Sequence, residues 1–521
     1  MPETVTVRVN GANVEVPANT SAAAAILLSS GFSRTSVMGE RRSAFCGMGT
    51  CFECRCEING ESHTRGCQVL CEHGMEIRTD SGASPEARAA LPSAARPERL
   101  HFQVVVVGGG PAGIAAAVAA AESGRSVAVL DDNLSPGGQT WRGENGKSST
   151  AGASEWLRRL RQSPVQIIPR ARIFHLENNG LAAETDRGVL ELSCRDLILA
   201  TGARELFLPF PGWTLQGVFG AGGLQALMKT GLPVAGKRIV VAGTGPLLLA
   251  VASYARNHGA KVAAVCEQTD AKKLARFGMA TMRTPGKLKD AVRFGWDLRG
   301  ISYWTNCWPV AASGRERLES VRLSRSGRIR EVECDYLACG FHLIPNLELP
   351  KLIACAIENE FVRVDELQQT SLPHVYCAGE ATGIGGLDKS LVEGRIAGYA
   401  ATGNEHAARR LFGERTRHAR FASEMKSAFE LRAELKSLAT PDTLLCRCED
   451  VAIGRASQFG GWRAAKLHTR CGMGPCQGRV CGAATEFLFG WSVDAVRPPA
   501  FAVKGASLAA VAAAEADRDE R

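Results

Sequence analysis

Cysteines gather near the two ends of this 521-residue sequence, in spacings that suit iron–sulfur chemistry. Six of the 18 cysteines lie between residues 46 and 71, and five lie between residues 446 and 481. The first group contains a C-x4-C-x2-C run and a further cysteine after twelve intervening residues, which is the plant-type spacing for a [2Fe–2S] cluster. Glycines between the cysteines allow the loop to wrap around a cluster and to aim backbone N–H groups at the sulfurs. The predicted ligands are Cys46, Cys51, Cys54 and Cys67.

A structural zinc site and scattered thiols are the competing interpretations of this first group. Zinc usually takes two short C-x2-C knuckles, whereas residues 46–71 contain one, so the spacing favours iron–sulfur. The two remaining cysteines of the group, Cys56 and Cys71, are expected to be ordinary buried thiols.

A glycine-rich stretch at residues 104–113 predicts a dinucleotide site. Four consecutive valines predict a buried parallel strand, and Gly108, Gly110 and Gly113 then fit G-x-G-x-x-G. Pro111 and Ala112 lie within this glycine turn, and residues 114–121 predict an alanine-rich helix whose free N–H groups would face a pyrophosphate. Asp131 ends the next strand, eighteen residues after Gly113, where the ribose-binding acid belongs. The glycines and the proline exclude a transmembrane helix over this apolar run.

A second strand–glycine–helix pattern follows in the middle of the chain. Gly243 and Gly245 follow an apolar strand, and Glu267 ends the next strand. An acid at that position suits NAD, because it repels the 2′-phosphate of NADP. The same pattern also suits another nucleotide or a vestigial site, so both interpretations stay open.

Composition limits the class of protein. An apolar fraction of 45% and a charged fraction of 22% are typical of a soluble globular protein. The net charge of +9 is modest for this length and no basic run stands out, so we expect no nucleic-acid surface. The N-terminus lacks a secretory pattern, which predicts a cytoplasmic protein, with peripheral attachment at the inner membrane face as an alternative. We expect no transmembrane segment. In such a protein 18 cysteines favour metal binding over disulfides.

The N-terminal and connecting stretches have clear local patterns. Residues 5–9 and 13–16 alternate around Asn10-Gly11, which predicts a hairpin, and residues 21–28 predict a short helix. Residues 82–100 are rich in Ala, Pro and Arg without helical periodicity, which predicts a linker. Residues 506–521 predict a frayed helix.

Together with the first glycine motif, further segments resemble the two-dinucleotide-domain flavoproteins related to glutathione reductase. These segments are Pro-Gly-Gly-Gln at 136–139, Ala-Thr-Gly at 200–202 and Val-Tyr-Cys-Ala-Gly-Glu at 375–380. The resemblance implies that the first motif binds FAD, and that an acid after the late strand reaches the flavin ribityl chain. Glu380 stands where Asp is usual. The residues it adds to the FAD site are Gly138, Gln139, Thr201, Gly202, Gly379 and Glu380.

The reductases of that family carry a redox disulfide, and this sequence lacks the pattern. No C-x-x-C or C-x4-C comes directly after the first motif, and residues 217–223 contain no cysteine. Cys334 and Cys339 have C-x4-C spacing but lie in an apparent strand, so we expect core thiols. Without a dithiol, electrons would leave the flavin through metal clusters.

The C-terminal cysteines resemble the bacterioferritin-associated-ferredoxin type of [2Fe–2S] domain. Cys-Arg-Cys-Glu at 446–449 and Gly-Met-Gly-Pro-Cys-Gln-Gly-Arg-Val-Cys at 472–481 carry the resemblance. It implies the ligands Cys446, Cys448, Cys476 and Cys481. Cys471 departs from the pattern and could replace Cys476, although C-x4-C is the tighter clamp. A zinc knuckle is the competing interpretation.

The combination resembles the large subunits of heteromeric amine dehydrogenases, the group of hydrogen cyanide synthase, opine oxidase and D-hydroxyproline dehydrogenase, with the ferredoxin fused. The resemblance implies an electron-transferring subunit. A partner FAD subunit would oxidise an amino or imino acid, and this chain would pass the electrons to a quinone or an electron-transfer protein. Consistent with that role, His63, His73, His342 and His468 are isolated and no acid–base pair stands out. The alternative is a self-sufficient NAD(P)H:acceptor reductase.

The predicted fold is therefore an α/β glutathione-reductase-like flavoprotein with a [2Fe–2S] domain at each end. Its cofactors would be FAD, two [2Fe–2S] clusters and NAD or another nucleotide at the second site. The predicted domains are a [2Fe–2S] domain at 1–81, a linker at 82–100, an FAD domain in two parts at 101–230 and 339–405, a second nucleotide domain at 231–338, a C-terminal [2Fe–2S] domain at 406–495 and a tail at 496–521.

Overall fold

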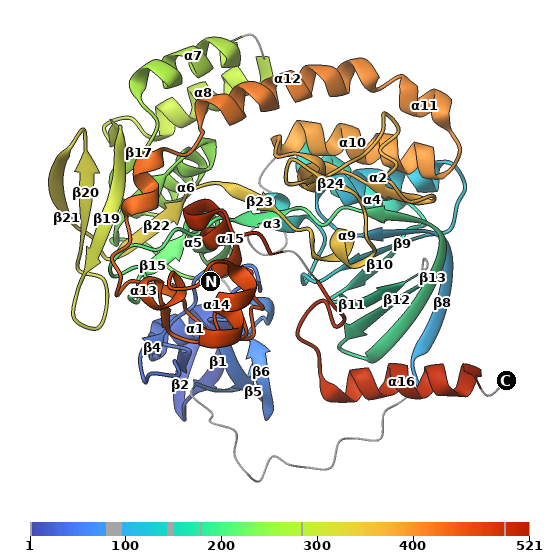
Figure 1. Ribbon diagram of the computed structural model, residues 1–521, viewed down its shortest axis with the longest axis horizontal. Helices are drawn as coiled ribbons and strands as arrows, with labels where there is room; N and C mark the ends of the chain where they lie inside the picture. The colour runs from blue at the N-terminus through green and yellow to red at the C-terminus, as the bar shows by residue number, and fades with distance from the viewer. Residues whose placement is uncertain are drawn as a thin grey trace. The chain divides into compact units, whose positions relative to one another are not determined.

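The computed structural model describes residues 3–79, 96–142, 151–177, 180–282, 285–493 and 496–519. The chain divides into two units, each assembled from three separate stretches (Figure 1). The first unit contains Met1–Ala83, Glu205–Leu343 and Glu424–Val493. The second unit contains Ser84–Arg204, Ile344–Ser423 and Asp494–Arg521.

The N-terminal part of the first unit is a small sheet with the strand order β2-β1-β7-β5-β6. The predicted hairpin is confirmed, because β1 (Thr4–Val9) and β2 (Ala12–Pro17) pair antiparallel around Asn10 and Gly11. Both turn residues have positive φ, at 52° and 85°, as a type I′ turn requires. The sheet is completed by β5 (Arg55–Ile58), β6 (Glu61–Arg65) and β7 (Glu76–Arg78).

The predicted N-terminal helix is also present, as α1 (Ala22–Ser29). It begins after Ser21, whose hydroxyl accepts a hydrogen bond from the Ala24 N–H at 3.3 Å. Its apolar residues pack against Val7, Val9 and Ile77 of the sheet. Cys56 and Cys71 are buried in the same core, as predicted.

A five-stranded parallel sheet with the order β15-β22-β16-β17-β18 forms the larger part of the first unit. Its strands are β15 (Val218–Gly220), β22 (Tyr336–Gly340), β16 (Arg238–Gly243), β17 (Lys261–Glu267) and β18 (Ser302–Thr305). Helices α5 (Ala221–Lys229) and α6 (Pro246–Asn257) pack their apolar faces on it. This part of the unit also contains an antiparallel sheet of β19 (Cys307–Ser313), β20 (Ser320–Arg325) and β21 (Arg328–Glu333). Two further helices are α7 (Ala271–Met282) and α8 (Pro285–Asp297).

Two predicted domain boundaries differ from this strand pairing. Val218 pairs with Leu337, so β15 and α5 belong with the second sheet and not with residues 101–204. Strand β22 continues to Gly340, which pairs with Gly243, so the second sheet does not end at residue 338. Short strands such as β15 carry too little pattern to reveal their partner in the sequence.

The C-terminal stretch of the first unit is mostly helical. It contains β27 (Leu444–Cys446), β28 (Val451–Ala452), α13 (Ile453–Ala456), α14 (Trp462–Thr469) and α15 (Cys481–Phe489). The short hairpin and the loop between α14 and α15 carry the C-terminal cysteines.

The second unit is built on a sheet with the order β10-β9-β8-β13-β12-β11, and β26 also pairs with β13. Strands β10 (Gln166–Pro169), β9 (Val127–Asp131), β8 (Glu98–Val107), β13 (Gly188–Leu199) and β26 (Val375–Cys377) run parallel. Strands β12 (Gly180–Thr185) and β11 (Arg172–Glu177) extend it antiparallel. The predicted strand at residues 104–107 is therefore confirmed as the end of β8.

Helices α2 (Pro111–Glu122) and α10 (Gly386–Ala401) pack closely beside this sheet. The close contact depends on two glycines of α10. A Cβ on Gly394 would lie 2.1 Å from the Ala112 carbonyl oxygen, and one on Gly398 would lie 2.3 Å from the Ala116 carbonyl oxygen. Helices α3 (Gly138–Trp141), α4 (Ala151–Gln162), α9 (Glu348–Leu352), α11 (Glu405–Arg409) and α12 (Phe412–Ala428) follow along the chain.

The predicted linker and tail are more ordered than the sequence indicates, in the residues that the structure describes. Strand β8 begins at Glu98, so the last three linker residues are part of a strand, and residues 82–95 lie outside the described residues. In the tail, α16 (Gly505–Asp519) packs Ala510 against Phe174 and Val189, so the alanine-rich helix is docked on the sheet.

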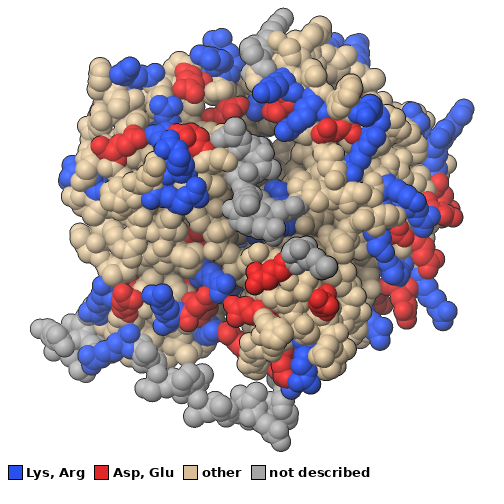
Figure 2. Space-filling view, turned by 180° about the vertical axis from the view of Figure 1, so that it is seen from behind, with Lys and Arg blue, Asp and Glu red and all other residues tan. Residues whose placement is uncertain are grey.

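Basic and acidic side chains alternate over the face seen in Figure 2, with no large region of one sign. Among the described residues, no helix combines the length and the apolar character needed to cross a membrane.

Candidate cofactor sites

The first glycine loop, residues 108–113, joins β8 to α2 at the carboxyl end of the parallel strands. Gly108 has a φ of 104°, and a Cβ there would lie 2.2 Å from the Ala200 carbonyl oxygen. A Cβ on Gly113 would lie 1.8 Å from the Gly108 carbonyl oxygen. Gly110 differs, because its φ is −75° and nothing lies within 4 Å of its Cβ position. The loop therefore leaves open space at the glycine where a pyrophosphate would approach.

Asp131 ends β9 directly beside this loop, since a Cβ on Gly109 would lie 2.5 Å from Asp131 Oδ2. Its Oδ1 accepts hydrogen bonds from the N–H and the side-chain amide of Asn133, at 3.1 and 2.7 Å. Its Oδ2 is buried and accepts none from the residues that the structure describes. Burial raises the pKa of the Asp131 carboxyl. A ligand hydroxyl at Oδ2 would satisfy this buried acceptor.

The other residues predicted for this site lie around the same loop. The 136–139 turn lies on it, because the Gly137 N–H donates to the Gly109 carbonyl oxygen at 2.7 Å and a Cβ on Gly138 would lie 3.1 Å from Gly110 Cα. Thr201 is fixed by Asn346, whose carbonyl oxygen accepts from the Thr201 hydroxyl at 2.7 Å. Gly379 lies against the start of α2, beside Ala112. Gln139 follows Gly138 in α3, and the Gly202 carbonyl oxygen accepts from the Asn346 N–H at 3.0 Å.

Glu380 already has a structural partner for each carboxylate oxygen. Oε1 accepts from the Gly386 N–H at 2.7 Å and Oε2 from the Gly385 N–H at 3.2 Å, which closes the turn before α10. Sequence reasoning missed the pair beside it. Lys389 and Glu393, four residues apart on α10, form a buried ion pair of 2.7 Å, and Glu393 also accepts from the Gly379 N–H. An i, i+4 Lys–Glu spacing was the only available indication in the sequence.

The four N-terminal cysteines predicted as ligands are brought together as two contacting pairs. Cys46 shares a hydrogen bond with Cys51, and Cys54 shares one with Cys67. Two thiolates per iron are what a [2Fe–2S] cluster requires. Backbone N–H groups also point at the sulfurs, with Met48 and Cys51 donating to Cys46 Sγ at 3.5 and 3.4 Å. The hydrogen bonds from Cys51 and the backbone lower the pKa of Cys46 to about 6, which favours the ligating thiolate.

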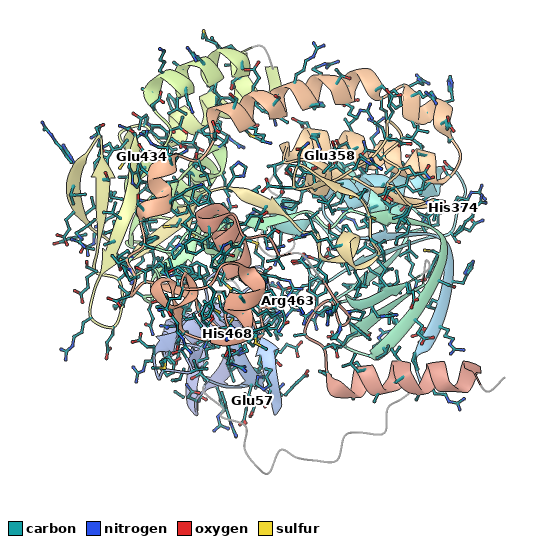
Figure 3. The ribbon with its side chains drawn as sticks, in the orientation of Figure 1. Glu57, Glu358, His374, Glu434, Arg463 and His468 are labelled. Atoms are coloured by element: carbon teal, nitrogen blue, oxygen red, sulfur yellow. The ribbon has the colours of Figure 1, made fainter. Side chains whose placement is uncertain are left out.

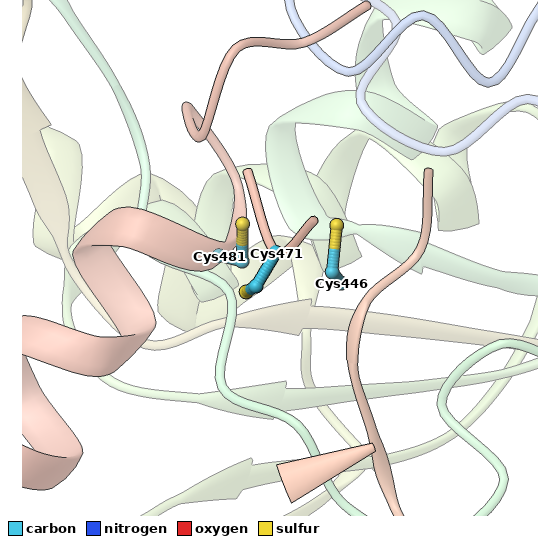
Figure 4. Close-up of side chains that lie close together, drawn as sticks. All are labelled: Cys446, Cys471 and Cys481. Carbon is cyan, nitrogen blue, oxygen red and sulfur yellow. The ribbon is translucent and has the colours of Figure 1, made fainter. Parts of the chain in front are cut away.

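The C-terminal cysteines also converge, and all five are buried. Cys448 shares hydrogen bonds with Cys446 and with Cys476, and Cys446 shares one with Cys481, so the four predicted ligands form one connected group. Cys471, which the prediction left out, contacts this group. The sulfurs of Cys446, Cys471 and Cys481 all lie within 4.8 Å of one another (Figure 4). Hydrogen bonds from Cys446 and Cys481 lower the pKa of Cys471 to about 5.

The second glycine loop is more crowded than the first. Glu267 is fully buried, and its oxygens accept from the Thr244 hydroxyl at 2.9 Å, the Gly245 N–H at 2.8 Å and the Thr269 N–H at 2.9 Å. The segment after α12 lies over this loop, where Gln268 donates to the Glu430 carbonyl oxygen at 3.1 Å. The Phe429 ring lies 4.0 Å from the Cβ position of Gly245.

Comparison with known proteins matches this architecture. Residues 102–401, more than half of the chain, match the pyridine nucleotide-disulphide oxidoreductase family, and residues 2–82 match the 2Fe-2S iron-sulfur cluster binding domain. The chain belongs to the pyridine nucleotide-disulphide oxidoreductase family. Within it, the chain is 32% identical to one of the subunits of opine oxidase from Rhizobium meliloti (strain 1021), over 74% of this chain and 92% of that one. It is 31% identical to hydrogen cyanide synthase subunit HcnB of Pseudomonas aeruginosa, over 73% and 91%.

These two relatives confirm the resemblance inferred from the sequence. Among solved structures, the chain is similar to L-proline dehydrogenase from P. horikoshii, with a TM-score of 0.68, 18% identity, and coverage of 97% of this chain and 98% of that one. That similarity shows a shared fold over nearly the whole length.

This member of the oxidoreductase family has no disulfide, because all 18 cysteines are free and buried. Cys334 and Cys339 are core residues, as predicted. One thiol pair was missed, since Cys266 and Cys307 are far apart in sequence but share a hydrogen bond. Both are fully buried, so a bulky thiol substrate has no access to them.

Two of the histidines have contacts that account for their positions. His468 of α14 stacks on Phe459 at 4.9 Å, and His374 pairs with Asp196 at 2.9 Å (Figure 3). The His374 pair lies where β26 begins, at the end of the parallel strands opposite the glycine loop. Both contacts are structural.

Proposed function

We propose that the chain is the electron-transferring subunit of a heteromeric FAD and iron–sulfur enzyme that oxidises the C–N bond of an amino or imino acid. The observation that carries the proposal is the combination of an open dinucleotide loop with two groups of contacting buried thiols. The relatives at 32% and 31% identity are named as subunits, of opine oxidase and of hydrogen cyanide synthase. A partner subunit would supply the site where the amine is oxidised.

FAD would be bound by the loop around Gly110, with the free Oδ2 of Asp131 accepting a ribose hydroxyl. The backbone at Thr201, Gly202 and Gly379 would line the same site. Bound FAD supplies chemistry that accepts electrons in a pair and releases them singly. The protein's own residues would position the cofactor.

Two [2Fe–2S] clusters would accept these single electrons. The N-terminal cluster would be held by Cys46, Cys51, Cys54 and Cys67, and the C-terminal cluster by Cys446, Cys448, Cys476 and Cys481. The two contacting pairs of the N-terminal set support the first cluster, and the close contacts among the C-terminal thiols support the second. Cys471 would remain a hydrogen-bonding neighbour of Cys446 and Cys481.

The alternative function, a self-sufficient NAD(P)H:acceptor reductase, would use the second glycine loop. The three hydrogen bonds that Glu267 already accepts from its own loop count against a nicotinamide nucleotide there. A quinone or an electron-transfer protein would take the electrons from the clusters in either case.

Cofactor analysis of the anaerobically purified chain, followed by mixing with NADH, tests the proposal. We expect one FAD and about four irons per chain, two for each cluster, and slow or absent flavin bleaching by NADH. Zinc in place of iron would refute both clusters. Rapid flavin bleaching by NADH would favour the reductase.

A further inference from the structure

Five buried charged side chains lie between the two cysteine loops of the first unit. We name Arg34, Arg42, Glu53, Arg447 and Asp450 the inter-loop network. Each of their side chains is at most 6% exposed, which is rare for groups that carry full charge. None of these residues is part of the cofactor sites described above.

The network connects the loops residue to residue. Glu53 stands between Cys51 and Cys54, and Arg447 stands between Cys446 and Cys448. Arg447 Nη2 donates to Glu53 Oε2 at 3.2 Å, so the side chains flanked by the two ligand sets are in direct contact.

Further bonds reinforce this contact. Arg34 Nη2 donates to Glu53 Oε1 at 2.7 Å and to the Arg447 carbonyl oxygen at 2.9 Å, so one guanidinium holds both loops. Arg42 donates to Asp450 at 2.8 Å, which forms a second ion pair between the same segments. Arg447 is also stacked, with its guanidinium carbon 4.3 Å from the Phe45 ring centroid.

The charges of the network do not balance. Three arginines face two buried carboxylates, and the Glu40 carboxylate, which contacts Arg42 at 3.3 Å, is 66% exposed and therefore screened by water. The Nε atoms of Arg34, Arg42 and Arg447 are buried and donate to no residue that the structure describes. A buried cation without a buried anion is costly, so the network is incomplete without further negative charge.

Cysteine thiolates on both sides would supply that charge. Cys51 of the N-terminal loop interacts electrostatically with Arg447, and Cys448 of the C-terminal loop interacts with Arg34. Arg447 therefore interacts with a thiol of the N-terminal loop, and Arg34 with a thiol of the C-terminal loop. The charge that compensates one cysteine set also faces the other.

We propose that the inter-loop network is a shared electrostatic control of the two clusters, setting both reduction potentials through the Glu53–Arg447 contact. The inference rests on the proposed function, since it requires both clusters. The network transfers neither an electron nor a proton itself. Its net positive charge stabilises the reduced form of each cluster, because reduction adds one negative charge.

Two substitutions at one contact should therefore act in opposite directions. Glu53→Gln raises the net charge of the network by one, so both clusters should become easier to reduce. Arg447→Gln lowers it by one, so both should become harder to reduce. We expect a change of at least tenfold in each reduction equilibrium, which is about 59 mV for a one-electron couple. Arg447→Lys keeps the charge and should restore most of the wild-type value.

The experiment is an anaerobic redox titration of the full chain, followed by electron paramagnetic resonance, with iron and acid-labile sulfide measured on every sample. The control is Glu76→Gln, which removes one charge from an exposed ion pair with Arg8 in the same domain. Opposite shifts in both clusters, with no shift in the control, support the proposal. A shift confined to the cluster nearer each substitution would overturn it.

The iron content separates this inference from the proposed function. About two irons per wild-type chain would refute the second cluster and hence the proposed function. Four irons with unchanged potentials in both variants would refute the inter-loop control alone. If the variants lose their clusters, the wild-type spectrum decides. Contacting loops predict magnetic coupling between the two reduced clusters, and two unperturbed signals would contradict the proposal.

Discussion

Glu205 offers a quantitative test of the first unit, because a buried carboxylate there works against stability at neutral pH. Its side chain is buried at the start of α5, where it accepts from the Gly222 and Gly223 N–H groups at 2.9 and 3.2 Å. Burial raises the pKa of Glu205 to about 7, and these two bonds offset only part of that effect. The folded state therefore binds a proton that the unfolded state releases near its ordinary pKa of about 4.5.

The sign follows from proton linkage. Between the unfolded and the folded pKa, the folded protein holds more protons, so stability falls as the pH rises through this window. A difference of about 2.5 pKa units corresponds to roughly 3 kcal/mol of the free energy of unfolding, and this contribution to stability is fully lost above pH 7. Glu205→Gln keeps a hydrogen-bond acceptor and removes the charge. Between pH 5 and pH 8, the melting temperature of the wild type should fall more steeply with rising pH than that of this variant.

The assay is circular dichroism of anaerobic samples at matched cofactor content. Glu76→Gln serves as control, because Glu76 lies in an exposed ion pair. Parallel pH profiles for the wild type and Glu205→Gln would refute the electrostatic argument. A variant less stable at every pH would show that the hydrogen bonds to α5 outweigh the desolvation of the charge.

Three further predictions concern the cofactor sites. Gly110→Val should fold normally but lose flavin absorbance, because its side chain enters the open space beside the loop. Gly113→Ala should instead lower the melting temperature, because its Cβ would lie 1.8 Å from a carbonyl oxygen. Full flavin retention by a folded Gly110→Val protein would be inconsistent with the FAD site. Asp131→Ala should weaken FAD binding by about 1–3 kcal/mol, roughly 5- to 150-fold, because the hydrogen bond to the ribose is lost. Flavin release on dilution measures this change, and an unchanged affinity would exclude that bond. In metal analysis, Cys471→Ser should retain about four irons per chain, whereas Cys476→Ser should lose about half of them. The reverse pattern would make Cys471 the ligand in place of Cys476.

Local patterns predicted the elements whose sequence carries a strong period. The valine run at 104–107 and the Asn10-Gly11 turn lie where the sequence placed them, because apolar strands and positive-φ turns leave distinct residue types. Cys46 and Cys51, predicted as ligands of one cluster, also lie close together, because only four residues separate them.

Long-range contacts could not be predicted in this way. Glu53 and Arg447 are separated by almost 400 residues, and nothing in either loop indicates that they meet. The placement of β15 depends on Leu337, and the docking of α16 depends on Phe174, so both need the tertiary fold. The likeness to a known family supplied the order of the domains, but not these contacts.

The most direct test of the proposed function is dye-linked dehydrogenation of amino and imino acids by this chain, alone and co-expressed with an FAD-containing partner. We expect no amine oxidation by the chain alone, and activity with the partner that decreases when Cys46 or Cys51 is replaced. Robust oxidation of an amino acid by the isolated chain would contradict the proposed function.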